Sequence, residues 1–152
     1  MRPLKYSLFL FCAFLELVIA QTLTNITIDD NDSRISYAGR WDSPTSHTSS
    51  RDYGGSHMLL QDRSGSATFT FTGVAVYYLA PKWPYAVDSY IALDGGTPQL
   101  VDMTVPATPR DPPNGEESVA YAVLWSATGL SNTAHRVVVT VGASFGIVDG
   151  FM

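Results

Sequence analysis

The chain has 152 residues and a formal net charge of −5, with 14 acidic side chains against 9 lysines and arginines. The positive side chains are scattered along the sequence rather than clustered. Nucleic acids and anionic membrane surfaces are bound through clustered cations, so we expect neither as a partner.

The first twenty residues, MRPLKYSLFLFCAFLELVIA, have the pattern of a secretory signal peptide. A positively charged start precedes an apolar run from Tyr6 to Ile19, and small or β-branched residues precede an expected cleavage after Ala20. The run is shorter than the ~20 residues that cross a bilayer, which argues against a retained anchor. We therefore predict a signal peptide at 1–20, one domain at 21–152, no membrane anchor in this chain, and a secreted, extracellular protein.

The mature chain lacks cysteine, because Cys12 is the only one and lies in the leader. It therefore has neither a disulfide framework nor a thiolate metal site, and its stability must come from packing. Asn25-Ile26-Thr27 and Asn31-Asp32-Ser33 match the N-glycosylation pattern and predict glycans at Asn25 and Asn31.

Short segments in which apolar and polar residues alternate fill the rest of the chain, as in half-buried β-strands. The clearest is Ala67–Thr72, where Ala67, Phe69 and Phe71 share one face and threonines the other. Turn residues separate the segments, and we expect Gly73 to mark a bend or tight turn and Gly129–Asn132 to turn the chain. The predicted strands are Leu23–Ile28, Ser33–Trp41, His57–Gln61, Ala67–Thr72, Val74–Leu79, Asp88–Leu93, Gln99–Thr104, Val119–Trp125, His135–Val141 and Phe145–Val148.

These segments predict an all-β fold with about nine strands, an antiparallel β-sandwich or barrel. No window after the leader has the helical period. Val105–Glu117 holds four prolines, which cannot donate to a sheet ladder, and is expected to be a long surface loop. Trp41 and Trp125 end or lie on strands and are expected in the core.

Four phrases taken together resemble a known family. They are Asp29–Trp41, Ala67–Val76, Ser89–Gly95 and Gly129–Val137. In this order they resemble the extracellular domain at the start of many fungal, especially basidiomycete, membrane proteins of unknown function. More distantly they resemble the galactose-binding-like jelly rolls, which include many carbohydrate-binding modules. The resemblance covers essentially the whole mature chain and implies a jelly-roll sandwich, but it supplies no catalytic motif. Those fungal relatives continue into a transmembrane helix, whereas this sequence ends at Met152.

The loop Ala80–Tyr85 is the strongest candidate for a ligand site. Trp83 and Tyr85 are stiffened by Pro81 and Pro84, and sugars stack their C–H faces on such rings at little cost in rotamer freedom. Lys82 and Asp88 flank these rings and are candidates to bond sugar hydroxyls, and Tyr53, in the Asp42–Gly55 loop, is a candidate to join the same surface. The competing interpretation is that the aromatic side chains fold down and cap the end of the sandwich.

Metal and catalytic sites have weaker signals. Asp29, Asp30 and Asp32 suggest a calcium loop, and jelly-roll modules commonly carry a structural calcium, but Arg34 occupies a position where an EF-hand needs a ligand. An Asx turn is the simpler interpretation, so we predict no metal or other cofactor.

The three histidines, His47, His57 and His135, lack metal-ligand spacing and are expected on the surface or on strands. Almost every aspartate stands in a turn, and Glu116 and Glu117 stand in the proline loop. A glycosidase needs two carboxylates that face each other across a cleft, so we predict no enzyme and no catalytic residues.

The sequence therefore predicts a secreted, non-catalytic β-sandwich that binds carbohydrate or a cell-wall glycan. One alternative is a structural or protein-interaction ectodomain without a small ligand, which predicts an exposed apolar patch away from Trp83. A glycoside hydrolase or another hydrolase is the second alternative.

Overall fold

The computed structural model describes residues 22–111 and 115–152, so the predicted signal peptide lies outside the described residues. The described chain forms two antiparallel β-sheets packed as a sandwich, with one 3-10 turn at Pro44–Ser46. The predicted fold class is confirmed. No helix among the described residues is long and apolar enough to cross a membrane.

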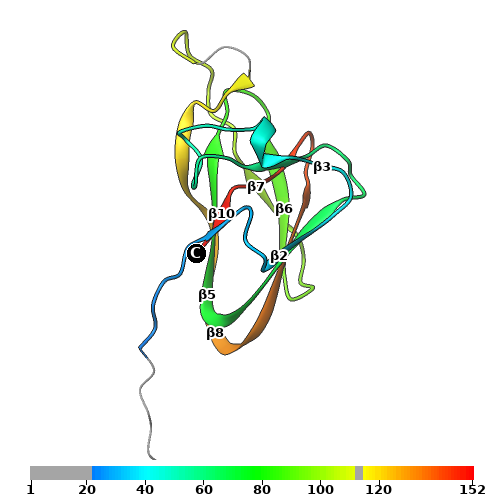
Figure 1. Cartoon of the computed structure of the whole chain (residues 1–152), viewed down its shortest axis with the longest axis vertical. Coiled ribbons are helices and arrows are strands. Elements are labelled where there is room, and N and C mark those ends of the chain that lie inside the picture. Colours follow the sequence, from blue (N-terminus) through cyan, green and yellow to red (C-terminus); the bar gives the residue numbers. More distant parts are fainter. Residues whose placement is uncertain (1–21, 112–114) are drawn as a thin grey trace, which may run out of the picture.

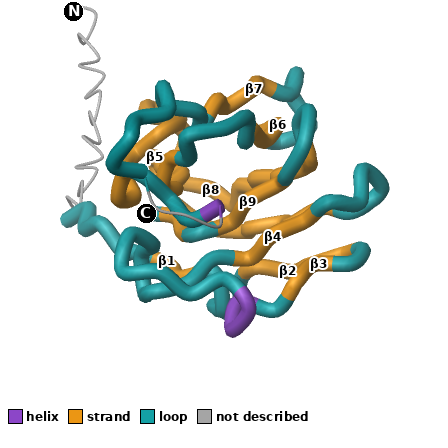
Figure 2. The backbone as a smooth tube through the Cα atoms, turned by 90° about the horizontal axis from the view of Figure 1, so that it is seen from above, coloured by secondary structure: helices purple, strands orange, loops and turns teal. Residues whose placement is uncertain are grey.

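The larger sheet has seven strands in the order β1-β10-β5-β8-β6-β7, and β2 pairs with a different part of β5. The smaller sheet has three strands in the order β3-β4-β9. Figure 2 shows β3 and β4 across the sandwich from β6 and β7. The strands are β1 (Ile28–Asp29), β2 (Ile35–Ala38), β3 (Trp41–Asp42), β4 (Met58–Leu60), β5 (Ser66–Lys82), β6 (Asp88–Leu93), β7 (Gln99–Asp102), β8 (Val119–Val141), β9 (Gly146–Val148) and β10 (Gly150–Phe151).

Strands β5 and β8 are far longer than the sequence predicted. Gly73 lies inside β5, and Gly129–Asn132 lies in the part of β8 that faces it. The register between the two strands shifts there, between Gly73 and Ala75 of β5. The predicted chain turn at Gly129–Asn132 is therefore wrong: it is an irregularity within β8, and Gly129 has a φ of 70° that favours glycine. Both strands bend there, at the lower end of the molecule in Figure 1.

Three further boundaries differ from the prediction. Leu23–Thr27 belongs to no strand and is exposed. The segment Ser33–Trp41 is divided at Gly39, which has a φ of 93° and lies against Gly65, into β2 and β3. At the end of the chain, Asp149 separates β9 from β10.

The core lies between the two sheets, and the alternation predicted for Ala67 and Phe69 is confirmed by their burial. Tyr78 is fully buried, and its hydroxyl donates to the Ile147 carbonyl at 2.7 Å. Trp41 and Trp125 pack against this core but are only half-buried. Their indole N–H groups, which needed partners, donate to the carbonyl of Ala38 and the side chain of Gln99.

We expect Val139→Ala to lower the free energy of unfolding by about 2 kcal/mol, because Val139 is fully buried between Ala67 and Ile91. Val123→Ala, on the exposed part of the same strand, removes the same groups and is expected to stay within about 0.5 kcal/mol of the wild type. Urea unfolding of both variants measures the difference. Equal losses would contradict the packing described here.

Candidate functional site

The loop between Thr48 and Ser56 is closed at its base by a short antiparallel bridge. Thr48 and Ser56 form an antiparallel bridge, and the His57 amide donates to the His47 carbonyl at 3.1 Å. Gly54 and Gly55 turn the loop with φ values of 69° and 95°. The bridge aligns His47 with His57, whose rings stack with centroids 5.2 Å apart.

His57 lies between two carboxylates from distant parts of the chain. Its Nδ1 is 3.0 Å from Oδ2 of Asp52 and 3.4 Å from Oε1 of Glu117. All three residues are buried, and the second oxygen of each carboxylate, Asp52 Oδ1 and Glu117 Oε2, has no hydrogen-bond partner. Burial raises the pKa of Asp52, against the lowering effect of its hydrogen bond with His57. We call Asp52, His57 and Glu117 the His57 centre.

A pocket of about 410 Å³ opens beside the His57 centre, and we call it the end pocket. Trp83, Tyr85 and Phe145 supply its aromatic lining. The polar lining comes from Ser46, His47, Thr48, His57, Gln61, Glu116 and Glu117. It therefore combines apolar rings with directed hydrogen-bonding groups, as ligand pockets do.

The structure brings only two of the five predicted ligand residues together. Trp83 and Tyr85 both line the end pocket, whereas Lys82, Asp88 and Tyr53 do not. Trp83 is only 3% exposed and packs edge-on against His57 with ring centroids 5.4 Å apart, so its ring is held as the capping interpretation expected. Tyr85 is 38% exposed, and its hydroxyl donates to the Gly115 carbonyl at 2.6 Å.

The other three predicted residues have structural contacts. Lys82 ends β5, where its carbonyl accepts from the Ser118 amide. Asp88 accepts from the Ala143 amide. Tyr53 packs edge-on against Tyr121, and its amide donates to Asp149.

The expectation that the histidines are surface or strand residues is wrong for His57, which is buried outside the strands and stacks on the partly exposed His47. Only His135 is a strand residue as expected: its Nδ1 is 2.7 Å from Asp94 Oδ2 and its Nε2 is 2.8 Å from the Ser131 carbonyl. These two acceptors raise the pKa of His135. The buried Asp52 and Glu117 also show that not all loop acids only make turns.

A second group of acids lies next to the His57 centre and consists of Asp29, Asp30 and Asp149, which we call the acid cluster. Asp30 and Asp149 are fully buried, and Oδ1 of each has no hydrogen-bond partner. Burial, with neighbouring carboxylates that include Asp52, raises the pKa of Asp149 to about 9. Burial and Asp29 raise the pKa of Asp30 to about 6.

The resemblance to jelly-roll modules raised the question of a structural calcium ion at the acid cluster. Its unpartnered oxygens are the hard ligands that calcium prefers. Among the described residues, however, only Asp52, His57 and Glu117 hold three possible ligand atoms within 4.8 Å of one another, so calcium binding at the acid cluster needs its side chains to shift. The Asp29 carboxylate packs directly on Gly54, where a Cβ would collide with it. Asp32 is not part of the cluster, because Arg34 pairs with it at 2.7 Å. An Asx turn therefore accounts for Asp32, but it does not account for the burial of Asp30 or for its unpartnered oxygen.

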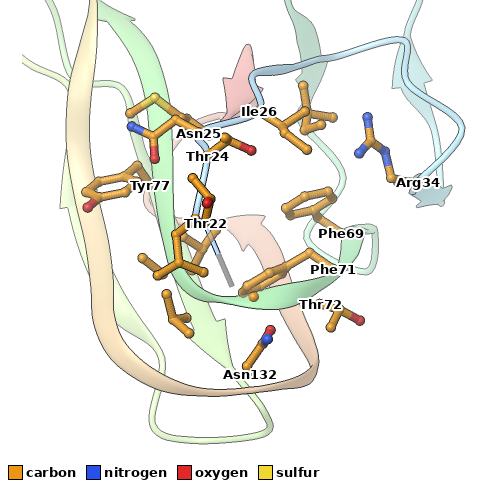
Figure 3. Close-up of a pocket in the computed structure, with 17 residues that line it drawn as sticks. Thr22, Thr24, Asn25, Ile26, Arg34, Phe69, Phe71, Thr72, Tyr77 and Asn132 are labelled. Atoms are coloured by element: carbon orange, nitrogen blue, oxygen red, sulfur yellow. The ribbon is translucent and has the colours of Figure 1, made fainter. Parts of the chain in front are cut away.

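A further pocket of about 360 Å³ lies at the bend of β5 and β8. Figure 3 shows Phe69 and Phe71 on one side of it and the segment from Thr22 to Ile26 on the other. Asn25, a predicted glycosylation position, lines this pocket. The wall made by residues 22–26 belongs to no strand.

No protein-family profile and no characterised protein sequence matches the chain. Solved structures do match. The exo-β-1,3-galactanase of Phanerochaete chrysosporium, in complex with β-1,3-galactotriose, aligns with a TM-score of 0.55 and 12% identity over 86% of this chain. A family two carbohydrate esterase from Cellvibrio japonicus aligns with a TM-score of 0.51 and 12% identity over 83% of it.

A family GH115 4-O-methyl-α-glucuronidase, with specificity for decorated arabinogalactans, aligns with a TM-score of 0.54 and 14% identity over 88% of the chain. The matches cover only 29%, 32% and 18% of these three structures. The chain thus shares its β-sandwich fold with parts of carbohydrate-active enzymes and spans about a third of their length or less.

We expect the acid cluster to make the stability of the protein depend on pH and on calcium. Folding raises the pKa of Asp149 from an ordinary value near 4 to about 9, so the folded state binds more protons than the unfolded state between these values. In EDTA we therefore expect the melting temperature to fall as the pH rises from about 4 to about 9. Millimolar calcium at pH 8 is expected to raise it by about 4 °C or more.

Asp149→Asn removes the titrating carboxyl, so both the pH-dependent decline and the response to calcium should shrink. Asp62→Asn is the control, because Asp62 is remote in the fold and its pKa is lowered by hydrogen bonds from Ser64. Thermal melts monitored by circular dichroism test both variants. A calcium response that Asp149→Asn leaves intact would contradict this assignment.

Proposed function

We propose that the protein is a secreted, non-catalytic module that binds neutral glycans at a cell surface or cell wall through the end pocket. The observation that carries the proposal is the half-exposed ring of Tyr85 beside a set of polar side chains in one pocket. A sugar needs both a ring on which its C–H face can stack and directed partners for its hydroxyls. The proteins that share the fold are named for their action on galactans, other carbohydrates and decorated arabinogalactans.

The charges of the end pocket favour a neutral ligand over an anionic one. Glu116 and Glu117 both line it, whereas no lysine or arginine does among the described residues. The formal charge of the whole chain is also negative. Uronic acids would meet repulsion here, so neutral hexose or pentose chains are the preferred class.

Absence of catalysis is part of the proposal, and the spacing of the acids supports it. In the His57 centre, ligand atoms of Asp52, His57 and Glu117 lie within 4.8 Å of one another. A glycosidase places its two carboxylates about 5–10 Å apart on opposite sides of the scissile bond. Here both carboxylates contact the same nitrogen of His57, which leaves no room for a sugar between them.

Secretion and glycosylation belong to the same proposal. The leader pattern at residues 1–20 supports export, and Asn25 and Asn31 are both exposed, as glycan acceptors must be. Neither asparagine lines the end pocket, so glycans on them would leave it open.

The test is a comparison of Tyr85→Ala with Tyr90→Ala on a glycan array and on insoluble cell-wall polysaccharides. The two tyrosines are 38% and 40% exposed, but only Tyr85 lines the end pocket. We expect Tyr85→Ala to weaken glycan binding at least about tenfold, since loss of a stacking ring costs ~1–2 kcal/mol. Tyr90→Ala should bind as the wild type does. Equal binding by both variants, or no binding by the folded wild type, would overturn the proposal.

A protein-interaction ectodomain is the second candidate, and one observation favours it. Val119, Tyr121 and Val123 alternate along β8 and are 46%, 42% and 47% exposed, which gives an apolar strip on one face. Among the described strands, only β5 pairs with this part of β8. The Tyr121 amide on this edge donates to the Arg51 carbonyl at 2.7 Å, so the edge is only partly open. A partly open strand edge with apolar side chains is typical of a docking surface for another chain.

Retention on cell surfaces separates the two candidates. If the protein acts by binding another protein, Val123→Lys should abolish the retention of labelled protein on cells. Protease treatment of those cells should have the same effect. Under the glycan reading, Tyr85→Ala and glycosidase treatment should abolish it instead, while Val123→Lys leaves it unchanged. Fluorescence of bound protein measures all four conditions.

A further inference from the structure

We propose that Asp52, His57 and Glu117 form a binding site for a divalent transition-metal ion of the zinc class, next to the end pocket. This inference goes beyond glycan binding and does not depend on it. It is also distinct from the hard-cation site of the acid cluster, because it includes an imidazole nitrogen.

The three potential ligand atoms already lie close to one another. His57 Nδ1, one oxygen of Asp52 and one oxygen of Glu117 lie within 4.8 Å of one another, a spacing that a single ion can bridge with small side-chain shifts. One carboxylate comes from the loop after Thr48 and the other from the segment before β8. An ion would therefore tie together two loops that are more than sixty residues apart in sequence.

The charge of the His57 centre is not balanced by the protein. Two buried carboxylates share one imidazole, so with both carboxylates ionised the group carries net negative charge even when His57 is protonated. Within the described chain, no lysine or arginine forms an ion pair with Asp52 or Glu117. Asp52 and Glu117 are each only 4% exposed, and each keeps one buried oxygen without a partner. Buried carboxylates of this kind need a counter-ion.

The orientation of the His57 ring is fixed by its neighbours. His47 stacks on one face at 5.2 Å between centroids, and Trp83 packs edge-on at 5.4 Å. A ring held in this way keeps Nδ1 pointed at the carboxylates, so little freedom is lost when an ion binds. His47 itself stacks parallel to His57 and contacts Asp42 through Nε2, so we assign it a supporting role rather than that of a ligand.

The chemistry of the donors selects the class of ion. One imidazole nitrogen with two carboxylates suits zinc and its neighbours in the first transition row, whereas calcium and magnesium prefer oxygen ligands alone. His57 and Glu117 also line the end pocket, which gives an ion a path from solvent and brings it within reach of donor atoms in that pocket.

The experiment titrates zinc chloride into the full secreted protein by calorimetry, after EDTA treatment and dialysis, in buffer that holds 1 mM calcium to fill the acid cluster. We expect one equivalent of zinc to bind. Variants His57→Gln and Glu117→Gln should weaken zinc binding at least about 100-fold and tenfold respectively. His135→Gln is the matched control, since it removes no ligand and its contacts are with Asp94 and Ser131, and it should stay within about threefold of the wild type.

A second measurement uses the wild type, so its outcome does not depend on whether a variant folds. In the wild type, imidazole ¹⁵N resonances of His57 should shift with one equivalent of zinc, while those of His135 should not. Zinc held at one equivalent by a folded His57→Gln variant would overturn the proposal. So would unshifted His57 resonances in the zinc-loaded wild type, or binding of calcium in preference to zinc at these residues.

Discussion

The antiparallel pairing of β5 with β8 is the constraint on which the rest of the structure depends. At one end it aligns Ser66 with Thr140, and at the other it aligns Lys82 with Val119. The residues just beyond that second end are Trp83 and Glu117, and the Ser118 amide donates to the Lys82 carbonyl. The pairing of β5 with β8 therefore places Trp83 and Glu117, which are 34 residues apart in sequence, in the lining of the end pocket. A shift of this register by one residue would face Trp83 and Glu117 away from each other.

The strands themselves could be read from the sequence, because alternation reports which side chains face the core. Asp88–Leu93 is a strand with the predicted bounds, and Ala67 and Phe69 are buried as their spacing predicted. The glycines led to predicted strand ends where β5 and β8 in fact continue. Gly73 and Gly129 are strong local signals for a turn, yet each sits opposite the other's segment in a continuous pair. Whether a glycine ends a strand or only bends it depends on its partner strand, which local sequence does not contain.

The candidate site was beyond prediction for a related reason. Asp52, Glu117 and Asp149 are ordinary loop residues when each is read with its neighbours, and no spacing joins them. Asp149 approaches Asp29 only because β1 pairs with β10, which brings together the two ends of the described chain. Trp83 and Tyr85 were found because aromatic side chains beside prolines stand out locally. Their unequal exposure was not visible there, because the Trp83 ring packs on His57, which is distant in sequence.

Buried charge is the feature that a purely structural account of this sandwich does not explain. Asp30, Asp52, Glu117 and Asp149 are all buried, and each has an oxygen without a partner. Such groups lower the stability of a fold unless a cation or a hydrogen bond compensates them. The apolar core is adjacent to them, because Trp83 belongs to that core and packs on His57. The raised pKa values of Asp30 and Asp149 mean that protonation offsets part of the cost at the acid cluster. At the His57 centre we propose a cation instead, which would make the stability of the loop and the shape of the end pocket depend on the ion that the protein binds.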